Sequence, residues 1–133
     1  MPPRFLVDTH ILVRWLTEPR RLSRVQERTL ESCATRGESI ALSDMTLLEI
    51  ALLFNAGQVR IKADLASLFR SIDSNELFQV LPMTTGIASE AGALVSLRDP
   101  ADRVIVATAR VHRLTLVTSD RLIVESKLIR TLE

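Results

Sequence analysis

Residues 5–16 read FLVDTHILVRWL, and this stretch sets the class of fold. Its apolar start predicts a short buried strand over Arg4–Val7. Asp8 follows at once, and the apolar residues beyond it recur at helical spacing, which predicts a helix over His10–Leu16. Pro19 ends that helix. A strand that passes directly into a helix is the first half of a βαβ unit, so a parallel sheet is expected.

The same alternation continues along the whole chain. Further strands are expected over residues 39–42, 78–81 and 114–118, with a short last strand over 128–132. Helices are expected from the Ser23 cap to Arg36, over Met45–Ala56, over Leu65–Ile72, from Thr84 or Thr85 to Leu97, and from the Asp99-Pro100 start to His112. Strands that alternate with helices predict a three-layer α/β/α fold with a mainly parallel sheet of four to five strands.

Composition limits the class of protein further. The 133 residues suit one domain over 1–133, and 47% apolar with 25% charged residues excludes a disordered chain. No apolar run is long enough for a membrane span, and Phe5–Val7 is too short for a signal peptide, so we expect a soluble, cytoplasmic protein. A net charge of +1 gives no overall basic field. The single cysteine, Cys33, excludes an internal disulfide and is expected on a surface helix.

Several common kinds of site are missing from the sequence. The four glycines cannot form a dinucleotide-binding or phosphate-binding glycine motif, and no nucleophile-elbow motif is present. The two histidines, His10 and His112, are far apart in the sequence and lack metal-ligand spacing. The residues that remain to carry chemistry are carboxylates.

Two of these carboxylates directly follow predicted strands. Asp8 comes after the first strand, and Asp120 ends the run Leu116–Asp120. Because the carboxyl ends of parallel strands meet at one edge of a sheet, both side chains are expected at that edge, where α/β proteins bind ligands. The alternative interpretation is that each aspartate only caps the helix that follows it.

Glu49 and the Asp99/Asp102 pair complete the acidic set. The neighbours of Glu49 one helical turn away are mostly apolar, so it is expected to point toward the buried side, where a carboxylate needs a partner or a metal. An ion pair with an arginine is the alternative. Asp99 and Asp102 stand at the cap and third position of one helix, where simple capping is again an alternative.

Convergence of these acids would define a particular chemistry. Two carboxylates about 4 Å apart repel by roughly 4 kcal/mol at an effective dielectric constant of about 20, so a cluster takes up protons or a divalent cation. Oxygen ligands alone favour Mg²⁺ or Mn²⁺ over zinc or copper. Such a centre is suited to metal-assisted phosphodiester hydrolysis.

Four segments resemble the motifs of PIN-domain nucleases, in the same order and at similar spacing. They are FLVDTH at residues 5–10, SDMTLLEIAL at 43–52, RDPADRVIVATA at 98–109 and LVTSD at 116–120. Together they span nearly the whole chain, and the chain length is similar to that of the VapC toxins of bacterial type II toxin–antitoxin systems. The expected fold is therefore PIN-like.

The resemblance implies a Mg²⁺- or Mn²⁺-dependent endoribonuclease. It assigns Asp8, Glu49, Asp102 and Asp120 as the catalytic, metal-binding acids, with Thr9, Asp99 and Thr118 in supporting positions. It also implies an RNA substrate, a homodimer, and a VapB-type antitoxin that wraps the toxin and covers the site. One or two metal ions, and transfer, ribosomal or messenger RNA as target, remain open at this point.

The residues themselves also favour self-association, because the predicted helices around Leu48–Phe54 and Leu65–Ile72 are apolar on more than one face.

Two other functions are alternatives to a nuclease. One is a PIN-fold module that binds RNA or a protein without catalysis. The other is a receiver-like phosphoacceptor domain, which also gathers aspartates around Mg²⁺ but needs a lysine directly after a late strand. Lys127 does not hold that position.

Overall fold

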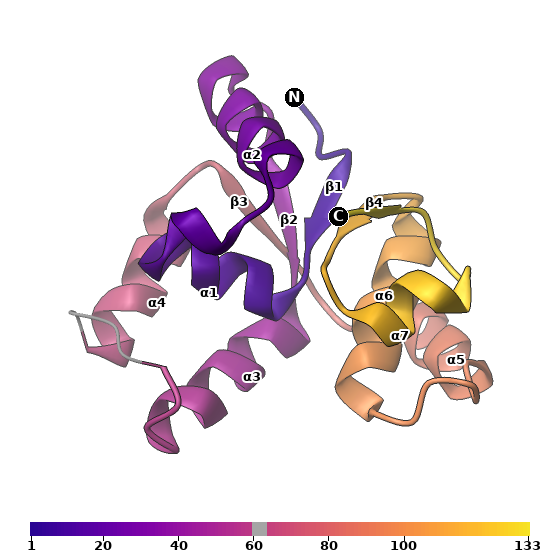
Figure 1. The fold of residues 1–133 in the computed structure, drawn as a ribbon. Helices are drawn as coiled ribbons and strands as arrows, with labels where there is room; N and C mark the ends of the chain where they lie inside the picture. The colour runs from indigo at the N-terminus through magenta and orange to yellow at the C-terminus, as the bar shows by residue number, and fades with distance from the viewer. Residues whose placement is uncertain (60–63) are drawn as a thin grey trace.

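The computed structural model of the chain describes residues 1–59 and 64–133. In these residues five strands form one all-parallel sheet in the order β3-β2-β1-β4-β5 (Figure 1). The strands are β1 (Phe5–Val7), β2 (Ile40–Ser43), β3 (Phe78–Leu81), β4 (Thr115–Val117) and β5 (Thr131–Leu132). The expected parallel α/β sheet of four to five strands is confirmed.

Helices cover both faces of this sheet. They are α1 (Thr9–Thr17), α2 (Arg24–Arg36), α3 (Asp44–Asn55), α4 (Leu65–Ser74), α5 (Thr85–Ala93), α6 (Pro100–His112) and α7 (Arg121–Ser126), with a 3₁₀ turn over Pro19–Arg21. None of the helices in the described part of the chain has the length and apolar character that a membrane crossing requires.

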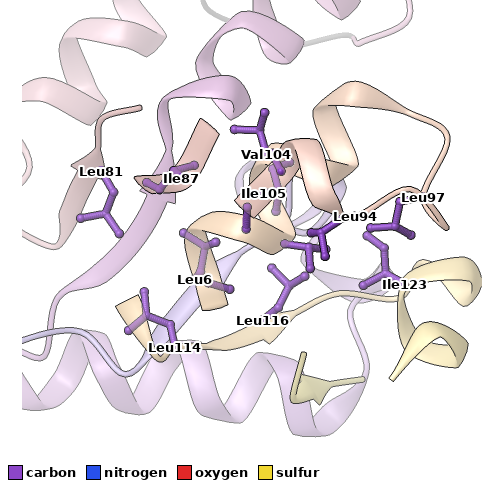
Figure 2. Packing of buried hydrophobic residues seen from close by; sticks show 14 of the residues in the cluster. Leu6, Leu81, Ile87, Leu94, Leu97, Val104, Ile105, Leu114, Leu116 and Ile123 are labelled. Atoms are coloured by element: carbon purple, nitrogen blue, oxygen red, sulfur yellow. The ribbon is translucent and has the colours of Figure 1, made fainter. Parts of the chain in front are cut away.

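Alternation along the short strands divides the core in two. Leu6 of β1 faces a cluster with α5 and α6, whereas Val7, the next residue, faces a cluster with α1, α2 and α4. Successive strand residues point to opposite faces of a sheet, so each strand serves both layers. Figure 2 shows the first cluster, in which Leu6, Leu116 and Ile105 gather between the sheet and α6.

The register of the two central strands places the acidic segments at one edge. Val7 of β1 pairs with Val117 of β4, so both strands end at the same level. The backbone N–H of Asp8 donates to the carbonyl of Val117 at 3.0 Å, which extends the pairing past the strand end. The residues after Val7 and Val117 therefore emerge side by side at the carboxyl edge of the sheet.

The capping signals read from the sequence are present. Ser23 and Gln26 form the expected capping box at the start of α2, and Gly37 closes that helix in the left-handed conformation with φ of 70°. Asp99 caps α6, which ends at His112 as expected. The capping residues thus stand at the helix ends where the sequence predicted them.

Two expectations were wrong, and two elements were not predicted. The helix expected to reach Leu97 ends at Ala93, and Leu94 and Leu97 are buried in the core beyond its end. Helix α7 and the 3₁₀ turn were not expected. Cys33 lies in the core rather than on the surface, because it shares the inner face of α2 with Leu30 three residues earlier.

Candidate active site

Five carboxylates line one cavity of about 390 Å³. They are Asp8 after β1, Glu49 on α3, Asp99 and Asp102 at the start of α6, and Asp120 after β4. The cavity lies at the carboxyl edge of the sheet and is lined by residues of α1, α3 and α6 together with Asp8, Asp99 and Asp120. All four acids that the sequence singled out as candidate ligands therefore border a single space.

Asp8 is the most enclosed of the five acids, with 4% of its surface exposed. Its Oδ1 accepts from the backbone N–H of Thr9 at 2.8 Å, and its Oδ2 accepts from the hydroxyl of Thr118 at 2.7 Å. The imidazole Nδ1 of His10 lies 3.4 Å from the same Oδ2. These contacts hold the carboxylate in one orientation at the base of the cavity.

Thr9 connects Asp8 to the opposite wall. Its hydroxyl donates to Oε1 of Glu49 at 2.6 Å and lies 3.0 Å from the hydroxyl of Thr46. Glu49 is half-buried at the rim of the core, and burial raises the pKa of its carboxyl. In the described part of the chain no arginine lies within ion-pair distance of Glu49, so the arginine alternative does not account for its position.

Asp99 and Asp120 are helix caps as well as cavity walls. Oδ1 of Asp99 accepts from the backbone N–H of Ala101 at 2.8 Å. Oδ1 of Asp120 accepts from the backbone N–H groups of Leu122 at 2.9 Å and of Ile123 at 3.2 Å, at the start of α7. Within the described residues neither Oδ2 has a protein donor, so capping leaves one oxygen of each carboxylate free.

Asp102 has the most strongly altered acidity of the group. It is half-buried, and no hydrogen bond to its carboxylate is found among the described residues. Burial, followed by the negative charges of Asp99, Asp120, Asp8 and Glu49, raises the pKa of Asp102 to about 7. A cation that enters the cluster would favour the ionised form of this carboxyl.

The donor set fits a hard divalent cation. All five side chains offer carboxylate oxygens, the ligands that Mg²⁺ and Mn²⁺ prefer. Among the described residues, however, no three acidic, histidine or cysteine side chains stand close enough to enclose an ion directly. The carboxylates therefore surround an open cavity, an arrangement that suits a cation such as Mg²⁺, which keeps several of its own waters.

Sequence reasoning missed three polar residues that line this cavity. His10 lies in it, and its Nε2 accepts from the backbone N–H of Ser119 at 3.0 Å while burial lowers the pKa of the ring. Arg14 and Arg21 also line it. The available signal was position: His10 lies three residues after a strand end, and Arg14 lies one helical turn further on. A search for metal-ligand spacing did not detect this signal.

The fold and the site together define a class: an α/β protein with a cluster of carboxylates at the carboxyl edge of a parallel sheet. The chain belongs to the PIN domain family, which it matches over residues 5–125. It is 31% identical over 118 residues to ribonuclease VapC22 of Mycobacterium tuberculosis. This alignment covers 87% of this chain and 86% of that protein.

Solved structures share the fold at lower identity. Chains from VapBC of Salmonella typhimurium bound to DNA and from VapBC2 of Rickettsia felis bound to a promoter DNA fragment align with TM-scores of 0.72 and 0.71. Their identities are 19% and 18%, and the alignments cover 98% and 99% of this chain and 97% and 98% of theirs. A chain of FitAcB from Neisseria gonorrhoeae has a TM-score of 0.70 and 21% identity, covering 97% and 96%.

Proposed function

We propose that this chain is a divalent-metal-dependent endoribonuclease that acts as the toxin of a type II toxin–antitoxin pair. One observation carries the proposal: carboxylates from four separate segments of the chain line a single cavity. Identity of 31% to a ribonuclease across most of both chains supports RNA as the substrate. An acidic cavity repels a polyanion unless cations neutralise it, so nuclease chemistry here requires a metal.

Mg²⁺ or Mn²⁺ is the cation that the donor set favours. Asp8, Glu49, Asp102 and Asp120 are the proposed ligands, and Asp99 stands beside them with one oxygen free of its capping role. When bound, the cation supplies charge for the scissile phosphate and lowers the pKa of a water.

The chain's own residues orient this centre. The hydroxyls of Thr118 and Thr9 hold Asp8 and Glu49 by short hydrogen bonds, so neither carboxylate rotates freely. In the absence of a cation, Asp102 is partly protonated near neutral pH, because its pKa is about 7. A cation and that proton therefore compete for the same carboxylate.

The proposed partners follow from the relatives and from the surface. Two of the solved structures are VapBC assemblies by title, which supports a VapB-type antitoxin as the partner. We propose that this antitoxin covers the acidic cavity. A homodimer is proposed through α3, where Leu48 and Leu52 are 53% and 60% exposed. Exposed leucines on one helix face are typical of a surface that another chain covers.

A cleavage assay tests the proposed function. Purified protein is expected to cut single-stranded RNA with Mg²⁺ or Mn²⁺, to stop in EDTA, and to resume when the metal is restored. Asp8→Asn is expected to reduce the rate at least a hundredfold with the chain still folded. Cleavage that continues in EDTA would overturn the metal mechanism. RNA that binds but is never cut, with any divalent metal, would instead support the non-catalytic RNA-binding module.

A further inference from the structure

The acidic cavity does not stand alone. Asp99 and Asp102 also line a second cavity of about 730 Å³, which runs between the turn before α6 and helix α7. The two cavities therefore adjoin at these two carboxylates. On the other side of the acidic cavity, Arg14 and Arg21 continue into a smaller hollow of about 280 Å³. These three cavities, which share lining residues, are together called the groove, and the carboxylates line its middle cavity.

Arginines stand on both sides of the acids, since Arg98 lines the second cavity. Arg14 and Arg21 stand on one side of the acids, and in the described part of the chain neither guanidinium has a carboxylate within ion-pair distance. Arg14 is half-buried, so its direction is constrained by packing. Two guanidinium groups without a protein counter-charge beside a hydrolytic centre suit phosphate oxygens.

The other side of the groove has a different character. Leu122 lines the second cavity and is 73% exposed, although it sits directly after the Asp120 cap of α7. The hydroxyls of Ser96 and Ser126 and the carboxylate of Glu125 border the same space. An exposed apolar side chain with polar groups around it matches the face and edges of an unpaired nucleobase.

We propose that a single RNA strand lies along this groove, with backbone phosphates on one side of the carboxylates held by Arg14 and Arg21, and a flanking base on the other side packed against Leu122. This proposal rests on the proposed ribonuclease function and specifies how the substrate is held. It requires single-stranded RNA, because a base that enters the second cavity cannot remain paired.

Binding without cleavage tests the arginine half of the proposal. A fluorescent single-stranded RNA of about ten nucleotides is titrated in the presence of Ca²⁺, so that the acidic cavity is neutralised, with wild-type protein, Arg14→Ala and Arg21→Ala, across a range of salt concentrations. Each variant is expected to raise Kd about fivefold or more. Each is also expected to reduce the slope of log K against log salt by about 0.7, the value for one lost phosphate contact on a single strand. Arg28→Ala is the matched control, since Arg28 is exposed on α2 and lines neither cavity.

Leu122 is tested by size and aromaticity. Leu122→Ala is expected to raise Kd several-fold with the salt slope unchanged, and to alter which nucleotides flank the cut. Leu122→Phe is expected to lower Kd, because an aromatic ring stacks on a base better than an aliphatic chain does. Val95→Ala is the control, at a residue 74% exposed that lines neither cavity.

The outcomes separate this proposal from the one on which it rests. If wild-type protein cuts RNA but Arg14→Ala and Arg21→Ala keep its Kd and salt slope, the groove is wrong and the ribonuclease function stands. Duplex RNA that binds as tightly as single-stranded RNA would also overturn the groove. If wild-type protein neither binds nor cuts RNA in any metal, the ribonuclease function itself has failed.

Discussion

Two threonine hydroxyls determine how the acidic centre is held. Thr118 donates to Asp8 and also accepts from the backbone N–H of Asp120 at 3.1 Å, so one side chain connects two of the acids. The hydroxyl of Thr9 donates to the carboxylate of Glu49. We propose that these threonines orient the carboxylates, as the partners of metal ligands do in known metal sites.

Thr118→Val tests this orienting role. Valine has the same shape but no hydroxyl, so the bonds to Asp8 and Asp120 are lost while packing is kept. We expect the RNA cleavage rate to fall at least tenfold and the free energy of unfolding to fall by about 1–3 kcal/mol, because buried polar groups lose a partner. Urea unfolding and initial cleavage rates measure both. Thr118→Ser, which keeps the hydroxyl, should restore most of the rate; a fully active valine variant would contradict the role.

The neighbouring acids Asp99 and Asp102 separate capping from catalysis. Asparagine caps a helix about as well as aspartate, so Asp99→Asn should change stability by only a few tenths of a kcal/mol and leave activity within about tenfold. Asp102→Asn removes the charge of a proposed ligand and should reduce the rate at least a hundredfold. The two cleavage rates and melting temperatures are compared side by side. The reverse pattern would move the ligand role to Asp99.

The same aspartate predicts a pH dependence. The pKa of Asp102 is about 7 in the folded chain, above the ordinary 3.8, so the folded state holds its proton over a range where the unfolded state has lost it. The contribution of Asp102 to stability therefore falls as pH rises from about 4 to about 7. Thermal melting in EDTA should show this loss in the wild type and not in Asp102→Asn. An identical pH profile for the two proteins would argue against the raised pKa.

At the scale of single elements, one buried carboxylate outside the acidic cavity holds a strand and a helix together. Glu38, in the turn between α2 and β2, accepts from Nε of Arg4 at 3.0 Å and from Arg36 at 3.0 Å, and contacts the thiol of Cys33 at 3.4 Å. It thus joins the start of β1 to the end of α2. The hydrogen bond from Arg4 is the main cause that holds the pKa of Glu38 below its usual value.

Glu38→Gln should loosen this junction. A depressed acid pKa contributes stability that is present above about pH 4.5 and is lost as pH falls through the folded-state pKa. We expect the variant to lose on the order of 1–2 kcal/mol at pH 7, since both arginines are solvent-facing and partly screened, and to lose less than that at pH 3. Urea unfolding at the two pH values measures the difference. Glu31→Gln, at an exposed position of α2, is the control.

The whole molecule presents an apolar stripe that the monomer does not cover. Leu48 and Leu52 lie one turn apart on α3 and point away from both core clusters. If α3 is the dimer surface, Leu48→Glu with Leu52→Glu should shift the mass from dimer to monomer in sedimentation at tens of micromolar, while helical content by circular dichroism stays the same. A wild-type monomer under these conditions would remove the basis for a homodimer.

Much of the architecture could be predicted from local patterns. Strand positions, helix caps and the parallel class of the sheet follow from periodicity and capping residues, which act over a few neighbours in the chain. The start and end of α6 and the capping box of α2 were predicted to the residue. The early end of α5 and the burial of Cys33 were not, because both depend on which other elements pack against them.

The candidate site divides in the same way. The acids were predictable as residues at strand ends and helix starts, because those places are visible in the sequence. Their assembly depends on β1 pairing with β4, which brings Asp8 within 2.7 Å of a threonine 110 residues away. No local pattern reports such a pairing. For that reason the sequence named the carboxylates, whereas the folded chain alone revealed His10, the arginines beside them, and the groove that they share.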